Sequence, residues 1–252
     1  MTDTICLGSD PRILFLASST AAMRAQMEGN RFTRAQAGAL RDDISTDEIT
    51  PVRILSHYDE SLGRFPYTGF TVDGERPIAA GAVRAVGFQV TVAGRRYGKG
   101  SSREHSPAAE KLAGIRLVIA ESFERLYRQN ADNIGLFTST DLGLVERLQR
   151  GEAIPTAELV AGRDALAAAI VRSGGLLRFG QQHLREALPA EAPGGDGPET
   201  LFEKIVRRHL LRTPVTPDAP RAGEGCFVRA DWRFIHEYYT GMAAHMSHAA
   251  LG

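Results

Sequence analysis

The chain has 252 residues, of which 43% are hydrophobic and 24% charged, as is usual for a globular protein of one large or two modest domains. Its 30 Lys and Arg residues balance 30 Asp and Glu residues, so the charge gives no reason to expect a nucleic-acid partner. No apolar run approaches the roughly 20 residues that span a bilayer, and residues 13–17 are too short for a signal core. We therefore expect neither a membrane segment nor export.

The two cysteines, Cys6 and Cys226, lie far apart and form no C-x-x-C motif. The sequence thus carries no recognisable metal or cluster motif of its own. Two lone thiols fit a reducing compartment, and we expect a cytoplasmic protein.

The first part of the chain predicts a strand, a helix and a long irregular region. Residues 12–17 read as a short buried strand, and residues 18–27 as a helix with Ser18 or Ser19 near its cap. The acidic, hydroxyl-rich stretch 41–51 ends at a proline and predicts a loop. Residues 52–87 hold scattered glycines and prolines without strong periodicity, which predicts irregular structure.

The middle of the chain alternates strand and helix patterns. A β-prone run at 88–92 and an apolar run at 116–120 enclose a helical pattern at 108–113. Ser122 is the expected cap of a further helix, with apolar positions at 123, 126 and 127. This order indicates a right-handed βαβ unit with at least two parallel strands, and the fold class is therefore α/β.

The last part predicts helices, a linker and a small terminal piece. Helices are expected over 142–149, over 156–171 with Asp164 as an internal start, and from 174 to about 188. Residues 189–198 hold three prolines and three glycines, which is typical of a linker. A helix over 199–211, a loop over 214–224, a strand over 226–230 and a short final helix follow. This piece alone buries a poor core, so we expect it to dock on the first domain or to complete another chain.

The chemistry concentrates in residues 97–105, Y-G-K-G-S-S-R-E-H, between a predicted strand and a predicted helix. Glycines let the backbone turn and approach a ligand closely, and a serine at a helix entry can cap amides that point at anions. Arg103 adds a planar fork that matches a carboxylate. The stretch therefore predicts a carboxylate-binding site, although an ordinary capped turn has the same composition.

Two other motifs are excluded at this position. A phosphate-binding P-loop needs Ser or Thr after its Gly-Lys pair, and here Gly100 follows Lys99. Ser101 and Ser102 lack the G-x-S-x-G spacing of a hydrolase elbow.

The 97–105 motif resembles the G-S-S-R-E-H loop of the aconitase superfamily, in the form found in the small subunit of 3-isopropylmalate dehydratase. D-I-S-T-D-E-I-T-P at 43–51 resembles the family's N-I-D-T-D-Q-I-I-P. Residues 114–136 resemble its A-G-I-R-A-V-I-A-P-S-F stretch with the Asn and N-G-L motifs that follow, and Gly-Gly-Leu at 174–176 resembles its closing helix. The match covers roughly residues 38–185, with four motifs in the family's order.

The tail resembles a different part of the same family. T-L-F-E-K-I at 200–205 and D-W-R-F-I-H-E at 231–237 are similar to the opening of the large subunit. The resemblance thus implies an aconitase-type swivelling β/β/α domain, a mixed sheet flanked by helices, over 1–188. A Pro/Gly linker would occupy 189–199, and a small α/β segment resembling the large-subunit N-terminus would occupy 200–252.

The resemblance implies a subunit of a hydro-lyase or isomerase that dehydrates and rehydrates a 2-hydroxy di- or tricarboxylate, in the first place one like isopropylmalate. Its active site would be shared with a large-subunit-like partner that carries a 4Fe-4S cluster, whose open iron acts as a Lewis acid. We therefore expect a hetero-oligomer, with little activity in this chain alone. The alternative is a non-catalytic regulatory or binding relative of the swivel domain. A cluster-independent serine enzyme is disfavoured, because no His or Lys base stands at recognisable spacing.

The resemblance also assigns site residues. Ser101 aligns with the base that removes the proton beside a carboxylate, and its alkoxide needs amides and cations such as Gly100, Ser102 and Arg103 provide. Arg103 would also bind a substrate carboxylate. These four positions are joined by Asp47, which aligns with the aspartate of the family's T-D motif.

For three further expected site residues, the sequence leaves more than one interpretation open. His236 aligns with a large-subunit histidine that protonates the leaving hydroxyl or binds a carboxylate, and an ordinary structural histidine is the other interpretation. Arg53 and Arg64 are both candidates for the substrate-binding arginine that follows the T-D motif. No metal ligand is expected in this chain. The stretch 56–64 matches neither the isopropylmalate nor the homoaconitase pattern, and Ala131-Asp132 replaces a Cys-Phe pair, so the substrate stays open.

Overall fold

The computed structural model describes residues 4, 5, 7, 8, 10–183, 188, 189 and 197–251. Cys6 and most of the predicted linker lie outside these residues. The chain divides into two units, Met1–Leu159 and Val160–Gly252, so the helices expected at the end of the first domain group with the tail.

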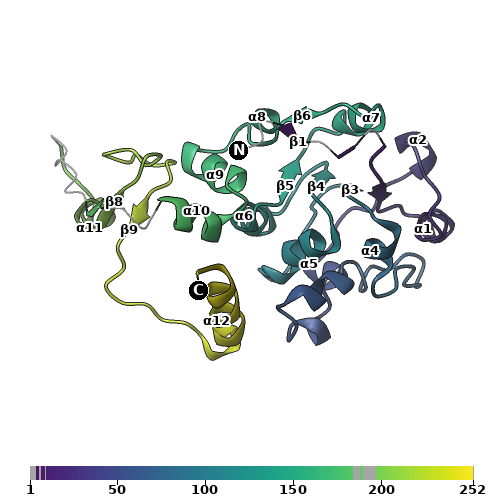
Figure 1. Cartoon of the computed structure of the whole chain (residues 1–252), viewed down its shortest axis with the longest axis horizontal. Helices are drawn as coiled ribbons and strands as arrows, with labels where there is room; N and C mark the ends of the chain where they lie inside the picture. The colour runs from purple at the N-terminus through teal and green to yellow at the C-terminus, as the bar shows by residue number, and fades with distance from the viewer. Residues whose placement is uncertain (1–3, 6, 9, 184–187, 190–196, 252) are drawn as a thin grey trace. The chain divides into compact units, whose positions relative to one another are not determined.

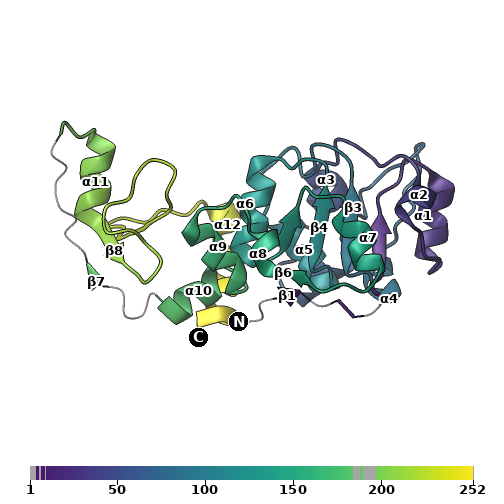
Figure 2. The same ribbon diagram turned by 90° about the horizontal axis from the view of Figure 1, so that it is seen from above.

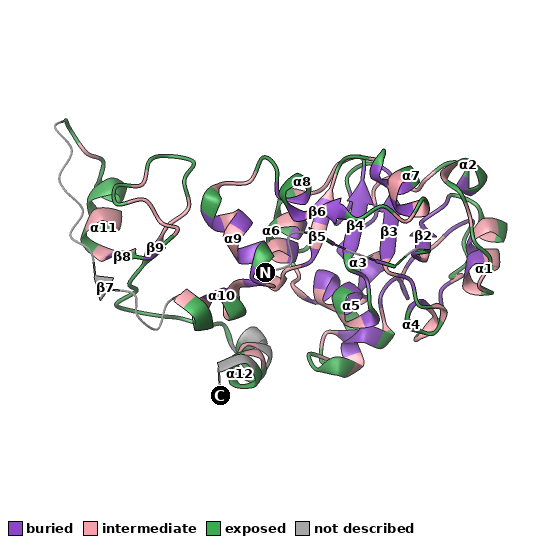
Figure 3. Cartoon of the chain, turned by 45° about the horizontal axis from the view of Figure 1, so that its top comes forward, coloured by how far each residue is buried: buried purple, intermediate pink, exposed green. Residues whose placement is uncertain are grey.

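Four short apolar runs form the central sheet of the first unit. They are β2 (Ile13–Phe15), β3 (Val90–Ala93), β4 (Leu117–Ala120) and β5 (Phe137–Ser139), which lie in this order and pair in parallel (Figure 1). Every residue of β2, β3 and β4 is buried, as expected of parallel strands covered on both faces (Figure 3). The predicted parallel strand–helix–strand unit is confirmed.

Alternate residues of the strands contribute to two cores. Leu14, Ala93 and Val118 share one core with helices α1, α4, α5 and α6, whereas Phe15, Val92 and Ile119 share the other with α7 and α8. The helices of the first core are α1 (Thr20–Met27), α4 (Ala82–Val86), α5 (His105–Ala113) and α6 (Arg125–Ile134). Those of the second are α7 (Leu144–Gln149) and α8 (Thr156–Leu159), beside the antiparallel strands β1 (Thr4–Ile5) and β6 (Ile154–Pro155).

The structure differs from the expected local structure at three points. The stretch 41–51 contains a helical turn, α3 (Thr46–Ile49), because Ser45 and Glu48 form a capping box. Ser122 does not cap α6, because its hydroxyl accepts a hydrogen bond from the amide of Arg96. The main sheet is parallel throughout rather than mixed, and the antiparallel pairs lie in two separate small sheets.

Short elements fill the region that was expected to be irregular. They are α2 (Arg34–Ala37), the 3-10 turns η1 (Val52–Ile54) and η2 (Glu60–Arg64), and α4. The turn η2 packs on α5, beneath the residues that follow the central motif.

The second unit is built from four helices and one small antiparallel sheet among its described residues. Its helices are α9 (Ala165–Arg172), α10 (Leu176–His183), α11 (Leu201–His209) and α12 (Glu237–Leu251), and its strands are β7 (Leu188–Pro189), β8 (Leu210–Arg212) and β9 (Phe227–Val228). Asp164 caps α9 as predicted, and Phe179 of α10 stacks on Phe227 of β9. Helix α11 runs directly into β8 (Figure 2). No described helix of the chain is long and apolar enough to cross a membrane.

Candidate active site

Two segments far apart in sequence, 43–50 and 97–103, form one framework. A parallel bridge pairs Ser45 with Lys99, and the amide of Thr46 donates to the Lys99 carbonyl at 2.8 Å. The amides of Gly98 and Lys99 donate to the carbonyl of Ile44 at 2.8 and 3.1 Å. The hydroxyl of Thr46 donates to the Ser101 carbonyl at 3.0 Å. The T-D segment therefore supports the Gly-Ser-Ser-Arg loop directly.

Gly98 allows this loop to lie against α6. Its φ is +82°, and a Cβ at this position would stand 2.3 Å from Cβ and Cγ of Tyr127. A side chain would therefore collide with a fully buried ring while forcing a left-handed backbone. The sequence predicted that the glycines let the backbone approach a ligand closely. At Gly98 the backbone instead approaches the ring of Tyr127.

Arg103 and Asp47 are brought together, and they differ in exposure. Nη1 of Arg103 donates to Oδ1 of Asp47 at 2.5 Å and to the Thr50 carbonyl at 3.2 Å. The arginine side chain is 11% exposed and the aspartate side chain 60%. Both acceptors meet one nitrogen, and in the described part of the chain no hydrogen bond is formed by Nε or Nη2. The other edge of the fork is thus available to a carboxylate.

Helix α5 begins after the two serines, so neither of them caps it. Its N-cap is Glu104, which makes no side-chain cap, and Pro107 in its first turn has no amide hydrogen. Ser101 and Ser102 are exposed. The Ser102 hydroxyl accepts from Asn130 of α6 at 3.4 Å, and no partner of the Ser101 hydroxyl lies among the described residues.

A small hollow of about 90 Å³ lies at this helix entry. Its wall includes Gly100, Ser101, Ser102 and Arg103 from the loop, together with Leu126 and Tyr127 from α6. Ligand pockets commonly measure about 300–1,000 Å³. The hollow is therefore a fragment of a site rather than an enclosed binding pocket.

The buried residues that follow the serines tie α5 in place. His105 is buried, and its Nε2 lies 3.1 Å from the Leu55 carbonyl, an acceptor, so this nitrogen carries the hydrogen. Burial lowers the pKa of His105 and raises the pKa of Glu104. The hydroxyls of Thr50 and Ser106 share a bond of 2.8 Å between α3 and α5. His105 is thus a buried structural link between α5 and the end of η1.

The other predicted residues are not joined to this cluster. Arg53 in η1 and Arg64 in η2 are exposed, and within the described residues no hydrogen bond or ion pair links either one to Asp47 or Arg103. His236 precedes α12 in the second unit, and its carbonyl accepts from the Thr240 hydroxyl at 3.2 Å. The roles assigned to Arg53, Arg64 and His236 stay predictions.

The donor groups that the structure describes do not fit an iron–sulfur cluster. Across the described ranges, no three His, Cys, Asp or Glu side chains gather so as to hold a metal ion. Cys226 is partly buried with the pKa of its thiol raised by burial, which disfavours the thiolate that iron needs.

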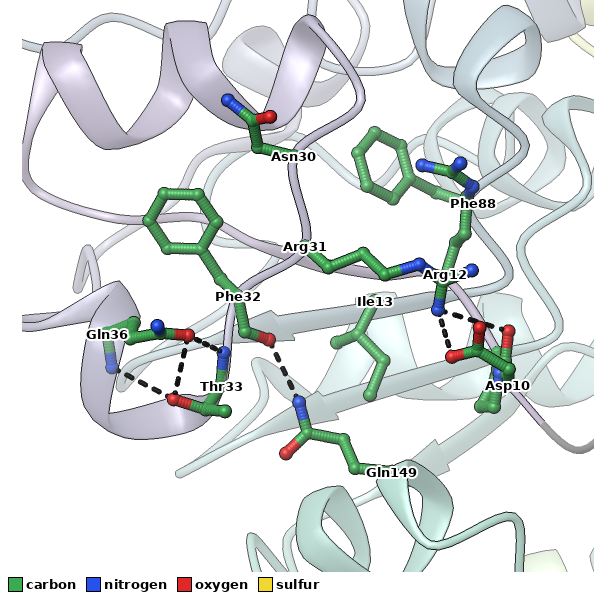
Figure 4. Close-up of a pocket in the computed structure, with 11 residues that line it drawn as sticks. Asp10, Arg12, Ile13, Asn30, Arg31, Phe32, Thr33, Gln36, Phe88 and Gln149 are labelled. Carbon is green, nitrogen blue, oxygen red and sulfur yellow. Dashed lines mark hydrogen bonds and ion pairs between the residues drawn. The ribbon is translucent and has the colours of Figure 1, made fainter.

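A second hollow, of about 260 Å³, lies elsewhere in the first unit (Figure 4). Arg12 and Arg31 line it, but Arg31 pairs with Asp10, and Arg12 donates to the Gly29 carbonyl. None of the predicted site residues borders this hollow.

Sequence reasoning missed the residues that position the loop. Thr46, Thr50 and Asn130 bond to the loop or to Arg103 through hydroxyl, carbonyl and amide groups. Thr46 and Thr50 flank Asp47 within one capped helical turn, and the Ser45-x-x-Glu48 spacing was the signal that marked it.

Comparison with known proteins places this framework in a family. Residues 72–140 match the Aconitase C-terminal domain. The 3-isopropylmalate dehydratase small subunit of Pyrobaculum aerophilum is 34% identical over 161 residues, covering 58% of this chain and 95% of that protein. The isopropylmalate/citramalate isomerase small subunit of Methanocaldococcus jannaschii is 31% identical, covering 58% and 92%. The chain belongs to the family of the 3-isopropylmalate dehydratase small subunits.

Other relatives match a shorter part. The 3-isopropylmalate dehydratase small subunit of Syntrophus aciditrophicus is 38% identical over 114 residues, which are 45% of this chain and 65% of that protein. A crystal structure of 3-isopropylmalate dehydratase from Methanocaldococcus jannaschii is 27% identical, covers 56% of this chain and 88% of that chain, and gives a TM-score of 0.41. The family membership predicted from the four motifs is confirmed, and the chain is a subunit of an aconitase-family hydro-lyase. The non-catalytic alternative is not favoured.

Proposed function

We propose that the chain is the small-subunit part of a heteromeric enzyme that dehydrates and rehydrates a 2-hydroxy di- or tricarboxylate, in the first place isopropylmalate. The observation that carries the proposal is one hollow bordered by both Ser101 and Arg103, whose side chain is only 11% exposed and whose guanidinium keeps one edge available. A hydroxyl beside a carboxylate-binding fork suits proton removal next to a carboxylate.

In this proposal the residues around the hollow have defined tasks. Arg103 binds a substrate carboxylate through Nε and Nη2, while Asp47 and the Thr50 carbonyl fix Nη1. The Ser101 hydroxyl, as alkoxide, accepts the proton of the carbon beside that carboxylate, and the adjacent guanidinium lowers the free energy of the alkoxide. Gly100 and Ser102 shape the loop around it. The task assigned to His236, to supply a proton or to bind a carboxylate, rests on the resemblance of residues 231–237 alone.

The size of the hollow argues for a partner chain. About 90 Å³ is smaller than an enclosed ligand site, and we assign the missing walls to another polypeptide. We assign the 4Fe-4S cluster to that large-subunit-like partner, because the described residues of this chain offer no ligand set for it. We also propose a cytoplasmic location, since an iron–sulfur cluster and lone thiols both fit reducing conditions.

The test is anaerobic co-purification of this chain with a large-subunit-like protein of the same organism. After reconstitution with iron and sulfide, alkene absorbance is followed with isopropylmalate, citrate, homocitrate and methylcitrate-type acids. We expect turnover that needs both chains, with isopropylmalate the best substrate. A complex with a cluster but no turnover on any acid would contradict the proposal.

Arg103→Lys sharpens this test. A lysine keeps the charge but loses the fork, so we expect kcat/KM to fall about a hundredfold, chiefly through KM. Arg95→Lys is the matched control, because Arg95 forms a surface pair with Asp42 and lines neither hollow.

A further inference from the structure

A buried glutamate with three phenol partners lies beneath the candidate site. Glu110 of α5 is 0% exposed. Its Oε1 lies 2.5 Å from the hydroxyls of Tyr67 and Tyr97, and its Oε2 lies 2.5 Å from the hydroxyl of Tyr127. Tyr97 also lies 3.0 Å from the Tyr67 hydroxyl, which in turn lies 2.8 Å from that of Thr91. Burying a carboxyl group costs free energy unless hydrogen bonds satisfy it, and here both oxygens have partners.

The number of protons distinguishes the two states of this cluster. Five oxygen–oxygen contacts join Glu110, the three tyrosines and Thr91. With an ionised Glu110, the four hydroxyls supply four protons, so one contact is left with two facing lone pairs. A protonated Glu110 supplies the fifth. The Thr91 hydroxyl then donates to the Tyr67 hydroxyl, which donates to Oε1 of Glu110. The proton on Oε1 is donated to the Tyr97 hydroxyl, which donates to the Tyr67 hydroxyl. The Tyr127 hydroxyl donates to Oε2.

Each tyrosine of the cluster connects to a segment of the candidate site. Tyr97 directly precedes Gly98, and the ring of Tyr127 is the surface on which Gly98 packs. The amide of Tyr67 donates to the carbonyl of Ile49, the last residue of the turn that carries Asp47. One buried cluster, Glu110 with Tyr67, Tyr97 and Tyr127, thus anchors three segments: the Gly98–Arg103 loop, α3 and α6.

We propose that Glu110 is a positioning residue, whose protonated carboxyl group closes the tyrosine cluster and so fixes the loop and the turn that carry Ser101, Arg103 and Asp47. Ionisation opens one contact of the cluster and loosens this support. The proposal concerns the same site as the proposed function, and its effect on substrate binding rests on that function.

The environment of Glu110 places the loss of its proton near neutral pH. Burial raises the pKa of Glu110 to about 7, and the hydrogen bonds from Tyr127, Tyr67 and Tyr97 oppose this rise. The titratable groups that face Glu110 are Tyr67 from the segment after η2, Tyr97 from the segment after β3, and Tyr127 from α6. The pKa of each tyrosine is raised well above its usual value, chiefly by burial. No ion pair of Glu110 is formed among the described residues, so no cation competes for the carboxylate.

The experiment compares hydrogen exchange of the full-length chain with that of Glu110→Gln between pH 6 and pH 8.5. At each pH the two proteins share the same intrinsic exchange rates, so their ratio reports protection alone. We expect protection of peptides covering 97–103 and 44–50 to fall about tenfold in the wild type, with a midpoint near pH 7, and to stay level in Glu110→Gln. The amide keeps a donor in the cluster and cannot ionise.

The same variant is then assayed in the complex with the large-subunit-like partner. We expect KM to rise several-fold across this pH range in the wild type with little change in kcat, and to remain level in Glu110→Gln. Equal pH dependence of protection in both proteins would overturn the proposal, as would a loss of protection spread evenly over the first unit. Exchange needs no substrate, so a failure of the proposed function leaves this result readable.

Tyr97→Phe provides a second route if Glu110→Gln does not fold. It removes one hydroxyl donor to the carboxylate, so the exchange midpoint should move to higher pH. An unchanged midpoint would mean that Glu110 does not control the loop.

Discussion

Two sets of predicted site residues, one in each unit, are held in different ways. In the first unit, Arg103 is 11% exposed and bonded to Asp47 and Thr50, and the loop before it is fixed by backbone bonds to residues 44–46. In the second unit, the segment that leads to His236 exposes its aromatic residues, with Trp232 82% and Phe234 92% accessible. The first part is preorganised within its own unit, whereas the second presents apolar surface of the kind that a partner covers.

The largest expected effect comes from the preorganised part. Ser101→Ala removes the proposed base and should lower kcat of the assembled enzyme by about 10³-fold or more, with assembly intact. Steady-state kinetics with gel filtration of the complex measures both quantities. Ser102→Ala is the matched control, since its hydroxyl accepts one long bond from Asn130, and we expect about tenfold or less. A Ser101→Ala enzyme at full rate would assign the base elsewhere.

The buried anchor beneath this part should make the first unit less stable as the pH rises. The folded Glu110 keeps its proton up to a pKa of about 7, whereas the unfolded carboxyl ionises near 4.5. The folded state therefore binds more protons between these values, and the free energy of unfolding falls through this window by about 3 kcal/mol, with no penalty below it. Denaturant unfolding of wild type and Glu110→Gln at pH 5 and pH 8 checks the difference. An identical pH slope in both proteins would contradict it.

The next largest effect is expected for substitutions of two glycines in the loop backbone. Gly98→Ala forces a left-handed alanine against Tyr127 at 2.3 Å, and we expect a loss of about 2–3 kcal/mol in the free energy of unfolding. Gly100→Ala shares a positive φ, but its nearest neighbour is Thr46 Oγ1 at 3.5 Å, so about 1 kcal/mol is expected. Thermal unfolding of the two variants separates contact from backbone strain. Equal losses would show that packing on Tyr127 contributes nothing.

The sequence predicted the elements that are marked by a local apolar pattern. The runs at 88–92 and 116–120 became β3 and β4, and the motif between them became a loop and helix α5. It missed α3, because one helical turn is too short for a periodic pattern and only its capping box marks it. It placed Ser122 at a helix cap, where the hydroxyl instead bonds a neighbouring loop amide.

The cluster around Glu110 could not be predicted from the sequence. The three partners of Glu110 stand at positions 67, 97 and 127, on segments that meet only after the sheet has formed. A glutamate in the pattern 108–113 reads as a solvated helix face, and burial by tertiary contacts overrides that reading. The same limit applies to Arg103, whose pairing with Asp47 joins residues 56 apart in sequence.

The smallest expected effect concerns the exposed segment of the second unit. Trp232→Ala should leave the free energy of unfolding of this chain within about 0.5 kcal/mol, because the side chain buries little surface here. If a partner covers the segment, the same change should weaken assembly about tenfold or more, as aromatic residues do at interfaces. Arg233→Ala, an exposed neighbour, is the control and should change affinity less than threefold. Titration of the partner by calorimetry measures both variants. Unchanged affinity for Trp232→Ala would mean that the partner binds elsewhere, and that this segment, with His236, stands outside the shared site.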